Sequence, residues 1–341
     1  MEINGIIAEI NFERADCMER IFSGMRPTGS LHIGHLSVLL NWIALQDEYE
    51  CFYGIVDWHA LTTGYEDRLN LPALIKDMAL DWLSVGLDPA KCSILVQSQV
   101  KEHAELHLLF SMITPLSWLE RVPTYKDQLQ QLGKAGGKDL STYGFLGYPL
   151  LQAADILVYK ANAVPVGEDQ LPHIELCREV ARRFNYMYGP VFPEPRSLVG
   201  KVPLLPGVDG RKMSKSYNNA ISLTASTDEI AKQVQQMITD PARLRKDDPG
   251  HPEVCIVYKF HETYTPEVAE VENNCRGGKI GCVACKRHLA ANLDKLLAPF
   301  RERRAQWEEP GKVEQVLQDG VERAREVVTV TMKEVRSLMG L

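Results

Sequence analysis

The feature that most constrains the fold of this chain is a short turn near its N-terminus, GSLHIGH at residues 29–35. The turn joins an apolar, strand-like run at 20–24 to a helix-like run at 36–45. In open parallel sheets, ligands bind at the carboxyl ends of strands, where free N–H groups at a helix N-terminus accept phosphate. His32 and His35 are three residues apart, so on one helical turn both rings would face the same phosphate group. A metal pair or two surface histidines is the alternative interpretation of an isolated HxxH pattern.

Strand-like and helix-like runs alternate through the first half of the chain. Further strands are expected at 51–56, 92–97 and 164–166, and further helices at 67–86, 102–112, 146–159 and 167–184. This alternation predicts an α/β fold built on a doubly wound, Rossmann-like parallel sheet. The polar, glycine-rich segment 127–138 predicts a loop over the site, and Lys126 at its root is a candidate phosphate ligand.

The composition changes after residue 218. Helical, charged segments are expected at 227–238, 265–274, 283–307 and 313–338, so this part should form a C-terminal α-helical domain. We therefore expect three parts: an N-terminal extension at 1–19, an α/β domain at 20–218 and a helical domain at 219–341.

Charge and hydropathy limit the classes of partner. The net charge is −7 over 341 residues, so binding to nucleic acid would need a local basic patch. The stretch 276–304 provides one, with eight Lys and Arg against Asp294 and Glu302, an excess of six; a solvated helix face is the alternative. No apolar run approaches the roughly 20 residues that span a bilayer, so we expect no membrane insertion and a cytoplasmic location.

Four of the eight cysteines gather late in the chain. Cys255, Cys275, Cys282 and Cys285 have the spacing C-x19-C-x6-C-x2-C, and four thiolates are a full ligand set for tetrahedral zinc or an iron–sulfur cluster. Zinc sites more often show two CxxC pairs, and this pattern has one pair and two single cysteines. The spacing therefore favours an iron–sulfur cluster, with Zn²⁺ or four reduced thiols as the alternatives.

A second motif lies at the end of the α/β part. Lys212-Met213-Ser214-Lys215-Ser216 follows the turn-rich segment PGVDG at 206–210, so two ammonium groups lie on a loop that can close on a polyphosphate. A solvated basic loop is the alternative. The order of the two motifs, HIGH and then KMSKS, resembles the signature pair of the class I aminoacyl-tRNA synthetases.

Further matches run along almost the whole chain from residue 21. They are FSGMRPTG at 22–29, DWHA at 57–60, LQAADIL at 151–157, VPVGEDQ at 164–170 and DPAR at 240–243, and together they resemble the bacterial tryptophanyl-tRNA synthetases. The resemblance implies a class I catalytic domain, a helical domain that reads the anticodon, and a homodimer. It also implies ATP with Mg²⁺, L-tryptophan and tRNA(Trp) as ligands, and some members with a similar cysteine pattern carry a [4Fe–4S] cluster.

The resemblance also assigns individual positions. His32, His35, Lys212 and Lys215 would act on the transferring phosphoryl group and the departing pyrophosphate. ATP would contact Arg26, Pro27, Thr28, Gly34, His35, Gly167, Glu168, Asp169, Val202, Lys212, Met213, Ser214, Lys215 and Ser216, and Lys126 joins this set from its position beside the polar loop. Tryptophan would contact Phe22, His59, Tyr148, Gln152, Asp155, Val164, Val166 and Gln170. Asp155 would accept the indole N–H, whereas Gln152 stands where some bacterial members carry an apolar residue.

The reaction implied is attack of the tryptophan carboxylate on the α-phosphorus of ATP, followed by transfer of tryptophan to the 2′-hydroxyl of the terminal adenosine of the tRNA. Catalysis of this type depends mainly on positioning and electrostatics. A tyrosyl-tRNA synthetase is the nearest alternative. A non-catalytic RNA-binding paralogue is another, although no phosphate-contacting histidine or lysine is missing from the two motifs.

Overall fold

A computed structural model describes residues 18–123, 140–200, 205–213 and 217–341, and its centre is a five-stranded parallel sheet. The strands are β1 (Arg20–Met25), β2 (Glu50–Ile55), β3 (Cys92–Val96), β4 (Ala163–Val166) and β5 (Arg196–Val199). Their order is β3-β2-β1-β4-β5, and every pairing is parallel. The predicted doubly wound parallel sheet is confirmed, and its strand order reverses between β1 and β4, where such sheets bind ligands.

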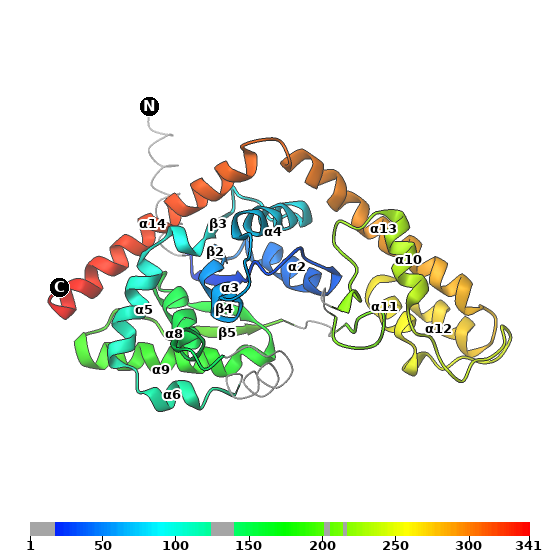
Figure 1. Ribbon diagram of the computed structural model, residues 1–341, viewed down its shortest axis with the longest axis horizontal. Coiled ribbons are helices and arrows are strands. Elements are labelled where there is room, and N and C mark those ends of the chain that lie inside the picture. Colours follow the sequence, from blue (N-terminus) through cyan, green and yellow to red (C-terminus); the bar gives the residue numbers. More distant parts are fainter. Residues whose placement is uncertain (1–17, 124–139, 201–204, 214–216) are drawn as a thin grey trace, which may run out of the picture.

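Helices cover both faces of the sheet (Figure 1). The chain up to residue 188 supplies η1 (Ile33–His35), α2 (Leu36–Leu45), α3 (Asp57–Gly64), α4 (Leu71–Val85), η2 (Gln97–Gln99), α5 (Glu102–Ile113), α6 (Leu116–Glu120), α8 (Tyr143–Leu157), η3 (Glu168–Gln170) and α9 (Leu171–Tyr188). One core packs α2 and α4 against the sheet, and a second core packs α5, α8 and α9 against the other face.

Local chemistry explains where α4 begins and ends. The Asn70 side chain accepts a hydrogen bond from the backbone N–H of Ala73, which caps the helix, and Pro72 occupies the first turn. Gly86 ends the helix at φ 126°, a backbone conformation that side chains with a Cβ rarely adopt. The helix observed at Leu71–Val85 is therefore shorter than the one that the apolar periodicity predicts at 67–86.

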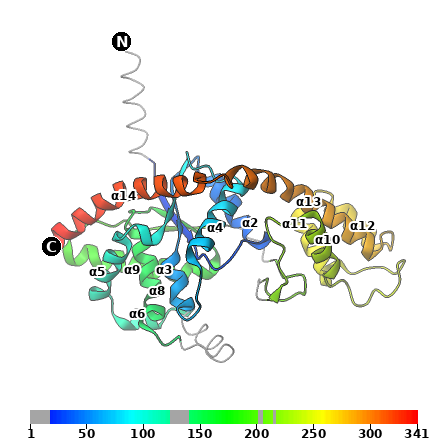
Figure 2. The same ribbon diagram turned by 45° about the horizontal axis from the view of Figure 1, so that its top comes forward.

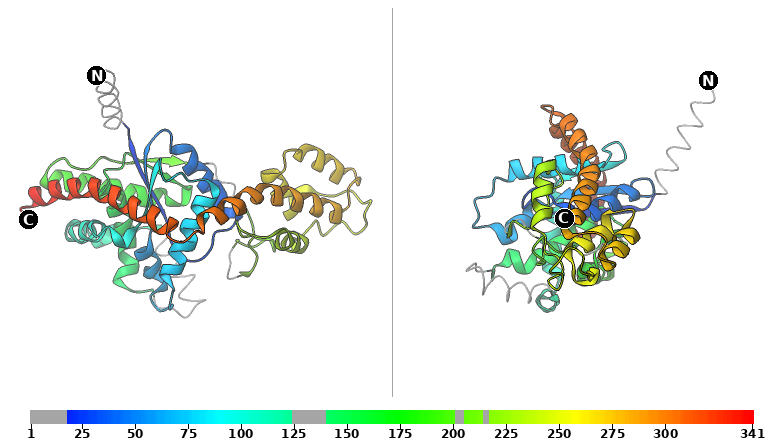
Figure 3. Two further views of the ribbon diagram at one scale, coloured as in Figure 1. Left: turned by 90° about the horizontal axis from the view of Figure 1, so that it is seen from above. Right: turned by 90° about the vertical axis from the view of Figure 1, so that its right-hand side faces the viewer.

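The C-terminal part is helical, as predicted. It comprises α10 (Thr227–Gln236), η5 (Pro252–Val254), α11 (Ile256–Tyr264), α12 (Val268–Arg276), α13 (Cys282–Trp307) and α14 (Lys312–Met339). Helices α10 to α12 gather around one end of α13, away from the sheet, and α13 extends from them toward α4 (Figures 2 and 3). Among the described residues, no helix is both long and apolar enough to cross a membrane.

The last helix returns to the sheet. Helix α14 lies along β3, and a Cβ on Gly320 would come within 1.9 Å of the backbone oxygen of Ile94, so only glycine permits this approach. Arg323 fixes the contact by donating hydrogen bonds to Ser93 Oγ (3.1 Å) and to the backbone oxygen of Cys92 (3.0 Å). The end of the chain therefore stabilises the sheet formed by its beginning.

The expected basic surface at 276–304 is largely used inside the protein. Five of its eight cations contact other parts of the chain: Arg276 with Glu253 and Glu272, Lys286 with the Gln235 backbone, Arg301 with the Ala225 backbone, Arg303 with the Ser84 and Val85 backbones, and Arg304 with Asp77, Asp81 and Glu308. Arg303 and Arg304 hold α13 against α4. Two of the cations counted in the predicted basic patch therefore serve a contact between helices, and the count of charges did not predict this.

Candidate active site

A cavity of about 370 Å³ opens at the carboxyl ends of β1 and β4, at the predicted ligand edge. Ten of the predicted site residues line it: Phe22, Arg26, His59, Tyr148, Gln152, Asp155, Val164, Val166, Gly167 and Gln170. Most of its surface is apolar. The polar groups that it does contain therefore determine which ligand it can accept.

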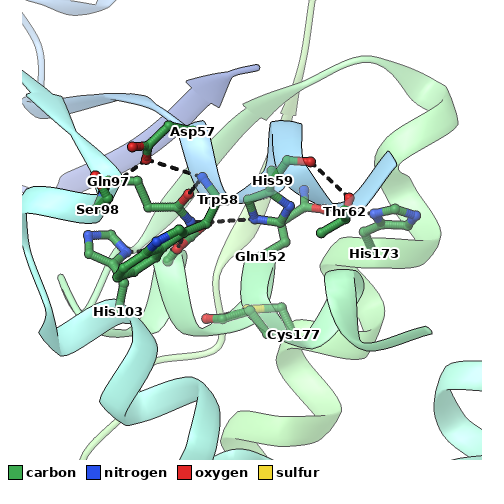
Figure 4. A network of polar contacts seen from close by, with 12 residues as sticks. Asp57, Trp58, His59, Thr62, Gln97, Ser98, His103, Gln152, His173 and Cys177 are labelled. Atoms are coloured by element: carbon green, nitrogen blue, oxygen red, sulfur yellow. Dashed lines mark hydrogen bonds and ion pairs between the residues drawn. The ribbon is translucent and has the colours of Figure 1, made fainter. Parts of the chain in front are cut away.

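Asp155, on α8, is the centre of a buried polar network at the cavity, and its partners His59, Gln97 and His103 are labelled in Figure 4. Its Oδ1 accepts hydrogen bonds from His103 Nδ1 (2.7 Å) and Gln97 Nε2 (2.8 Å). Its Oδ2 accepts from His59 Nε2 (2.9 Å) and from the same Gln97 amide (2.9 Å). The hydroxyl of Tyr159 lies 2.9 Å from His103 Nε2, and a neutral ring that donates through Nδ1 accepts there. The carboxylate is thus held in one orientation from several sides.

The charge of Asp155 follows from these contacts. Burial alone would raise the pKa of the carboxyl group, because only 1% of the residue is exposed. The hydrogen bonds from His103 and His59 outweigh burial and lower the pKa to about 2. The cavity therefore ends in an ionised carboxylate that attracts a hydrogen-bond donor.

A second polar chain crosses the cavity wall. Gln152 Oε1 accepts a hydrogen bond from His173 Nδ1 (2.7 Å), and Tyr148 Oη lies 3.3 Å from His173 Nε2. Burial lowers the pKa of His173 to about 4, so its ring is neutral at neutral pH. The side-chain carbonyl of Gln152 therefore accepts its hydrogen bond from His173 and fixes the orientation of that ring.

The GSLHIGH turn packs against segments that follow residue 217. The backbone N–H of Ile33 donates to the Ile221 oxygen (2.9 Å), and Leu223 N–H donates to the Leu31 oxygen (3.2 Å). The hydroxyl of Tyr264, on α11, donates to the Ile33 oxygen (3.1 Å). The backbone on both sides of His32 is thus fixed from the C-terminal part of the chain.

The structure brings the two signature segments together. The rings of His32 and His35 are in contact, with centroids 3.9 Å apart, as their three-residue spacing predicted. A Cβ on Gly34 would lie 3.3 Å from Met213 Sδ, so the first motif touches the second. Lys212 is exposed to solvent. Asn219 stabilises the turn that precedes Lys212, because its side-chain amide donates hydrogen bonds to Asp209 Oδ1 (2.7 Å) and to the backbone oxygen of Lys212 (3.1 Å).

The other predicted nucleotide contacts lie nearby or outside the described part. Pro27 and Thr28 follow β1, and Glu168 and Asp169 belong to η3 beside Gly167. None of these four lines the cavity. The predicted residues Lys126, Val202, Ser214, Lys215 and Ser216, and the predicted loop at 127–138, lie outside the described residues.

The four late cysteines lie in or next to the end turns of three neighbouring helices. Cys255 precedes α11, Cys275 lies in the last turn of α12, and Cys282 and Cys285 lie in the first turn of α13. Burial, followed by the charges of the other three cysteines, raises the pKa of Cys285 to about 12. The other three thiols are thus close enough to Cys285 to affect its pKa. In the described ranges, however, no group of three or more His, Cys, Asp or Glu is arranged to hold a metal ion.

Several residues of the cavity and of the polar network behind it were not predicted from the sequence. His173 is missing from the predicted set although it follows Gln170 by three residues, a spacing that places both on one helix face. Gln97 and His103 follow β3 at the carboxyl edge of the sheet, where polar residues after a buried strand are a usable signal. Phe145, Trp42 and Asn41 have no comparable signal, because only tertiary packing brings them to the cavity.

Comparison with known proteins gives a consistent result. The family model described as "tRNA synthetases class I (W and Y)" matches residues 18–298. A tryptophan–tRNA ligase of Thermotoga maritima is 54% identical over 94% of this chain and 99% of that protein. Another, from Aquifex aeolicus, is 45% identical over 94% of this chain and 100% of that protein. A solved tryptophanyl-tRNA synthetase from Campylobacter jejuni, complexed with ADP and tryptophan, is 32% identical, with a TM-score of 0.84 over 94% of this chain and 100% of that one.

Proposed function

The chain belongs to the class I tRNA synthetases of the tryptophan and tyrosine family, and we propose that it activates L-tryptophan with ATP and transfers it to tRNA(Trp). The observation that carries the choice of amino acid is the buried, ionised Asp155 at the end of a largely apolar cavity. An indole ring matches the apolar walls, and its single N–H matches the carboxylate. A phenyl ring would leave the carboxylate without that donor, a mismatch that rejects phenylalanine strongly.

The arrangement of donors suggests how the indole binds. Of the three side chains that donate to Asp155, only His59 lines the cavity, whereas Gln97 and His103 lie behind the carboxylate. The indole N–H would therefore share or replace the His59 hydrogen bond to Oδ2. Phe22, Tyr148, Val164 and Val166 line the cavity and would form the walls, and Gln170, which also lines it, would meet the polar end of the amino acid.

ATP would lie between the two signature segments. His32 and His35 would donate to the phosphoryl group during attack by the tryptophan carboxylate, and Lys212 and Lys215 would stabilise the departing pyrophosphate. Arg26, Pro27, Thr28, Gly34, Gly167, Glu168, Asp169 and Met213, with Lys126, Val202, Ser214 and Ser216, would complete the nucleotide site. Mg²⁺ would be held chiefly by the ATP phosphates, whose negative charge it neutralises.

The second step transfers tryptophan to the 2′-hydroxyl of the terminal adenosine of tRNA. Residues 20–218 would carry the catalytic site, and 219–341 would read the anticodon, with α14 anchored on the catalytic sheet. The test uses tRNA(Trp) that ends in 2′-deoxyadenosine or in 3′-deoxyadenosine. We expect charging of the 3′-deoxy transcript alone, and charging of the 2′-deoxy transcript alone would contradict the assignment.

A homodimer in the cytoplasm is the expected form of such an enzyme. Adjacent helices α5, α6 and α8 carry exposed apolar side chains at Leu108, Met112, Leu116 and Tyr143, a surface suited to a second copy of the chain. Light scattering on the purified protein should give twice the chain mass. The substitution Met112→Asp should lower that mass to the monomer value, and a monomeric parent protein would contradict the dimer.

The cysteine site would hold a [4Fe–4S] cluster that clamps the helical domain. Four thiols from three helices are the donor set that such a cluster needs. Gly250 makes room for one of them, since a Cβ there would lie 2.5 Å from Cys275 Sγ. The cluster would supply only cross-linking between helices and take no part in adenylation.

Purification in the absence of oxygen tests this assignment. The protein should be brown and contain iron and sulfide in equal amounts, whereas colourless protein with one Zn²⁺ per chain would exclude the cluster. Full tRNA charging by a Cys282→Ser variant of normal stability would exclude the clamping role.

A further inference from the structure

A buried carboxylate holds the backbone of the GSLHIGH turn. Asp81 lies in α4 and is 1% exposed, and its Oδ2 accepts a hydrogen bond from the backbone N–H of Leu31 (2.8 Å). Leu31 immediately precedes His32. The position of this carboxylate therefore helps to determine where the His32 side chain lies.

The other oxygen of Asp81 is bound by a residue from the far end of the chain. Arg304, in α13, donates from Nη1 to Asp81 Oδ1 (2.6 Å) and from Nη2 to Asp77 Oδ1 (2.5 Å). Burial alone would lower the pKa of Arg304, but the Asp77 hydrogen bond and the charge of Asp81 raise it. One guanidinium thus clamps two carboxylates that lie one turn apart on α4.

This pair cannot lose one member without affecting the turn. A buried carboxylate without a cation takes up a proton or rotates toward water. In either case the geometry at Leu31 N–H changes, because both oxygens belong to one rigid carboxylate group. The chain of contacts therefore runs from Arg304 through Asp81 to the backbone beside His32.

We propose that Asp81 and Arg304 are positioning residues for ATP, which set the GSLHIGH turn and couple it to the placement of α13. The proposal rests on the assignment of the ATP phosphates to this turn. Helix α13 has Cys282 and Cys285 in its first turn and Arg304 in its last. Its 26 residues span about 39 Å, with Pro299 inside the helix between the two ends, so one continuous helix connects the cysteines to the residue that holds Asp81.

The neighbouring Arg303 provides a matched control. Its Nε donates a hydrogen bond to the backbone oxygen of Ser84 (2.6 Å), and its Nη2 donates one to the backbone oxygen of Val85 (3.0 Å). Arg303 therefore also joins α13 to α4. The two residues that it contacts lie at the C-terminal end of α4, and neither is Asp81. A general weakening of the contact between α13 and α4 should therefore affect both arginines alike.

The test compares Arg304→Gln with Arg303→Gln in ATP–pyrophosphate exchange. We expect Arg304→Gln to lower kcat/KM for ATP by about tenfold or more, because small displacements of a catalytic group have effects of that size. The Kd for tryptophan, measured without ATP by fluorescence, should stay within about twofold, and Arg303→Gln should leave both values within about twofold. Equal effects of the two substitutions, equal effects on ATP and tryptophan, or no effect of Arg304→Gln would overturn the proposal.

Two further measurements keep the proposal testable. If Arg304→Gln does not fold, Arg304→Lys retains a cation but loses the two-carboxylate clamp and should show a smaller loss in the same direction. ATP affinity by calorimetry should weaken in Arg304→Gln even if the parent protein shows no exchange with tryptophan. That combination would reject the proposed function and retain the positioning role, whereas unchanged ATP affinity and kcat/KM would reject the positioning role alone.

Discussion

His103 Nδ1 and Asp155 Oδ1 lie 2.7 Å apart although 52 positions separate the two residues in the sequence. The pair joins α5 to α8 directly behind the cavity, and neither residue is more than 1% exposed. Protein donors therefore fix the orientation of the Asp155 carboxylate, which is proposed to accept the indole N–H, before tryptophan binds.

The substitution Asp155→Asn should weaken tryptophan recognition selectively. The substitution keeps the shape of the side chain and removes its charge. The fall in kcat/KM for tryptophan should correspond to a loss of about 2–4 kcal/mol in transition-state stabilisation, as for a buried charged hydrogen bond. The KM for ATP should change little. Pyrophosphate exchange at varied tryptophan and varied ATP measures both values, and equal losses for the two substrates would refute the assignment.

Acid should destabilise the protein partly through His173. Burial lowers the pKa of His173 to about 4, below the value of about 6.5 in an unfolded chain, so between these values the unfolded state binds more protons. The contribution of His173 to stability is complete above about pH 6.5 and is lost as the pH falls through about 4. The variant His173→Gln should therefore flatten the fall in thermal midpoint over this range. A slope identical to that of the parent would show that His173 is not buried in its neutral form.

Lys215→Ala should slow formation of the adenylate without loss of tryptophan binding. The amino acid complex contains no pyrophosphate, so a cation that serves only the leaving group contributes nothing to it. Single-turnover adenylate formation and equilibrium titration with tryptophan separate the two effects. A variant with weakened tryptophan affinity would remove Lys215 from the proposed phosphate role.

The contact between α14 and β3 gives a stability prediction. Gly320→Ala places a methyl group where the Ile94 oxygen lies and should cost about 1–3 kcal/mol in the free energy of unfolding. Gly144→Ala, on α8, is the matched control, because nothing lies within 4 Å of its added Cβ. Denaturant unfolding should show a lower midpoint for the first variant only; equal stability of the two would mean that α14 can shift without cost.

The architecture was largely accessible from the sequence, because apolar runs of strand length and helical periodicity are local signals. The strands around residues 21, 52, 94 and 165 and the helical C-terminal part are confirmed. Strand β5 was not predicted, since Arg196–Val199 is a short, partly exposed edge strand without an apolar run. The return of α14 to β3 could not be inferred either, because it depends on a long-range contact at Gly320.

The candidate site was predictable where short motifs carry the chemistry. The pattern of HIGH and KMSKS identified the family, which the family match and the relatives confirm. The supporting contacts were not predictable, since Gln97 and His103 reach Asp155, and Arg304 reaches Asp81, only through the tertiary fold. For the same reason the excess of positive charge at 276–304 was misleading: the sequence counts cations but does not show that Arg303 and Arg304 bind α4.

ATP–pyrophosphate exchange with purified protein, run in parallel with tryptophan, tyrosine and phenylalanine, tests the central claim most directly. The ionised Asp155 at the end of an apolar cavity predicts exchange that depends on tryptophan, with phenylalanine inactive and tyrosine at least about a hundredfold weaker in kcat/KM. Exchange driven by tyrosine in preference to tryptophan, or no exchange with any of the three amino acids, would contradict the account.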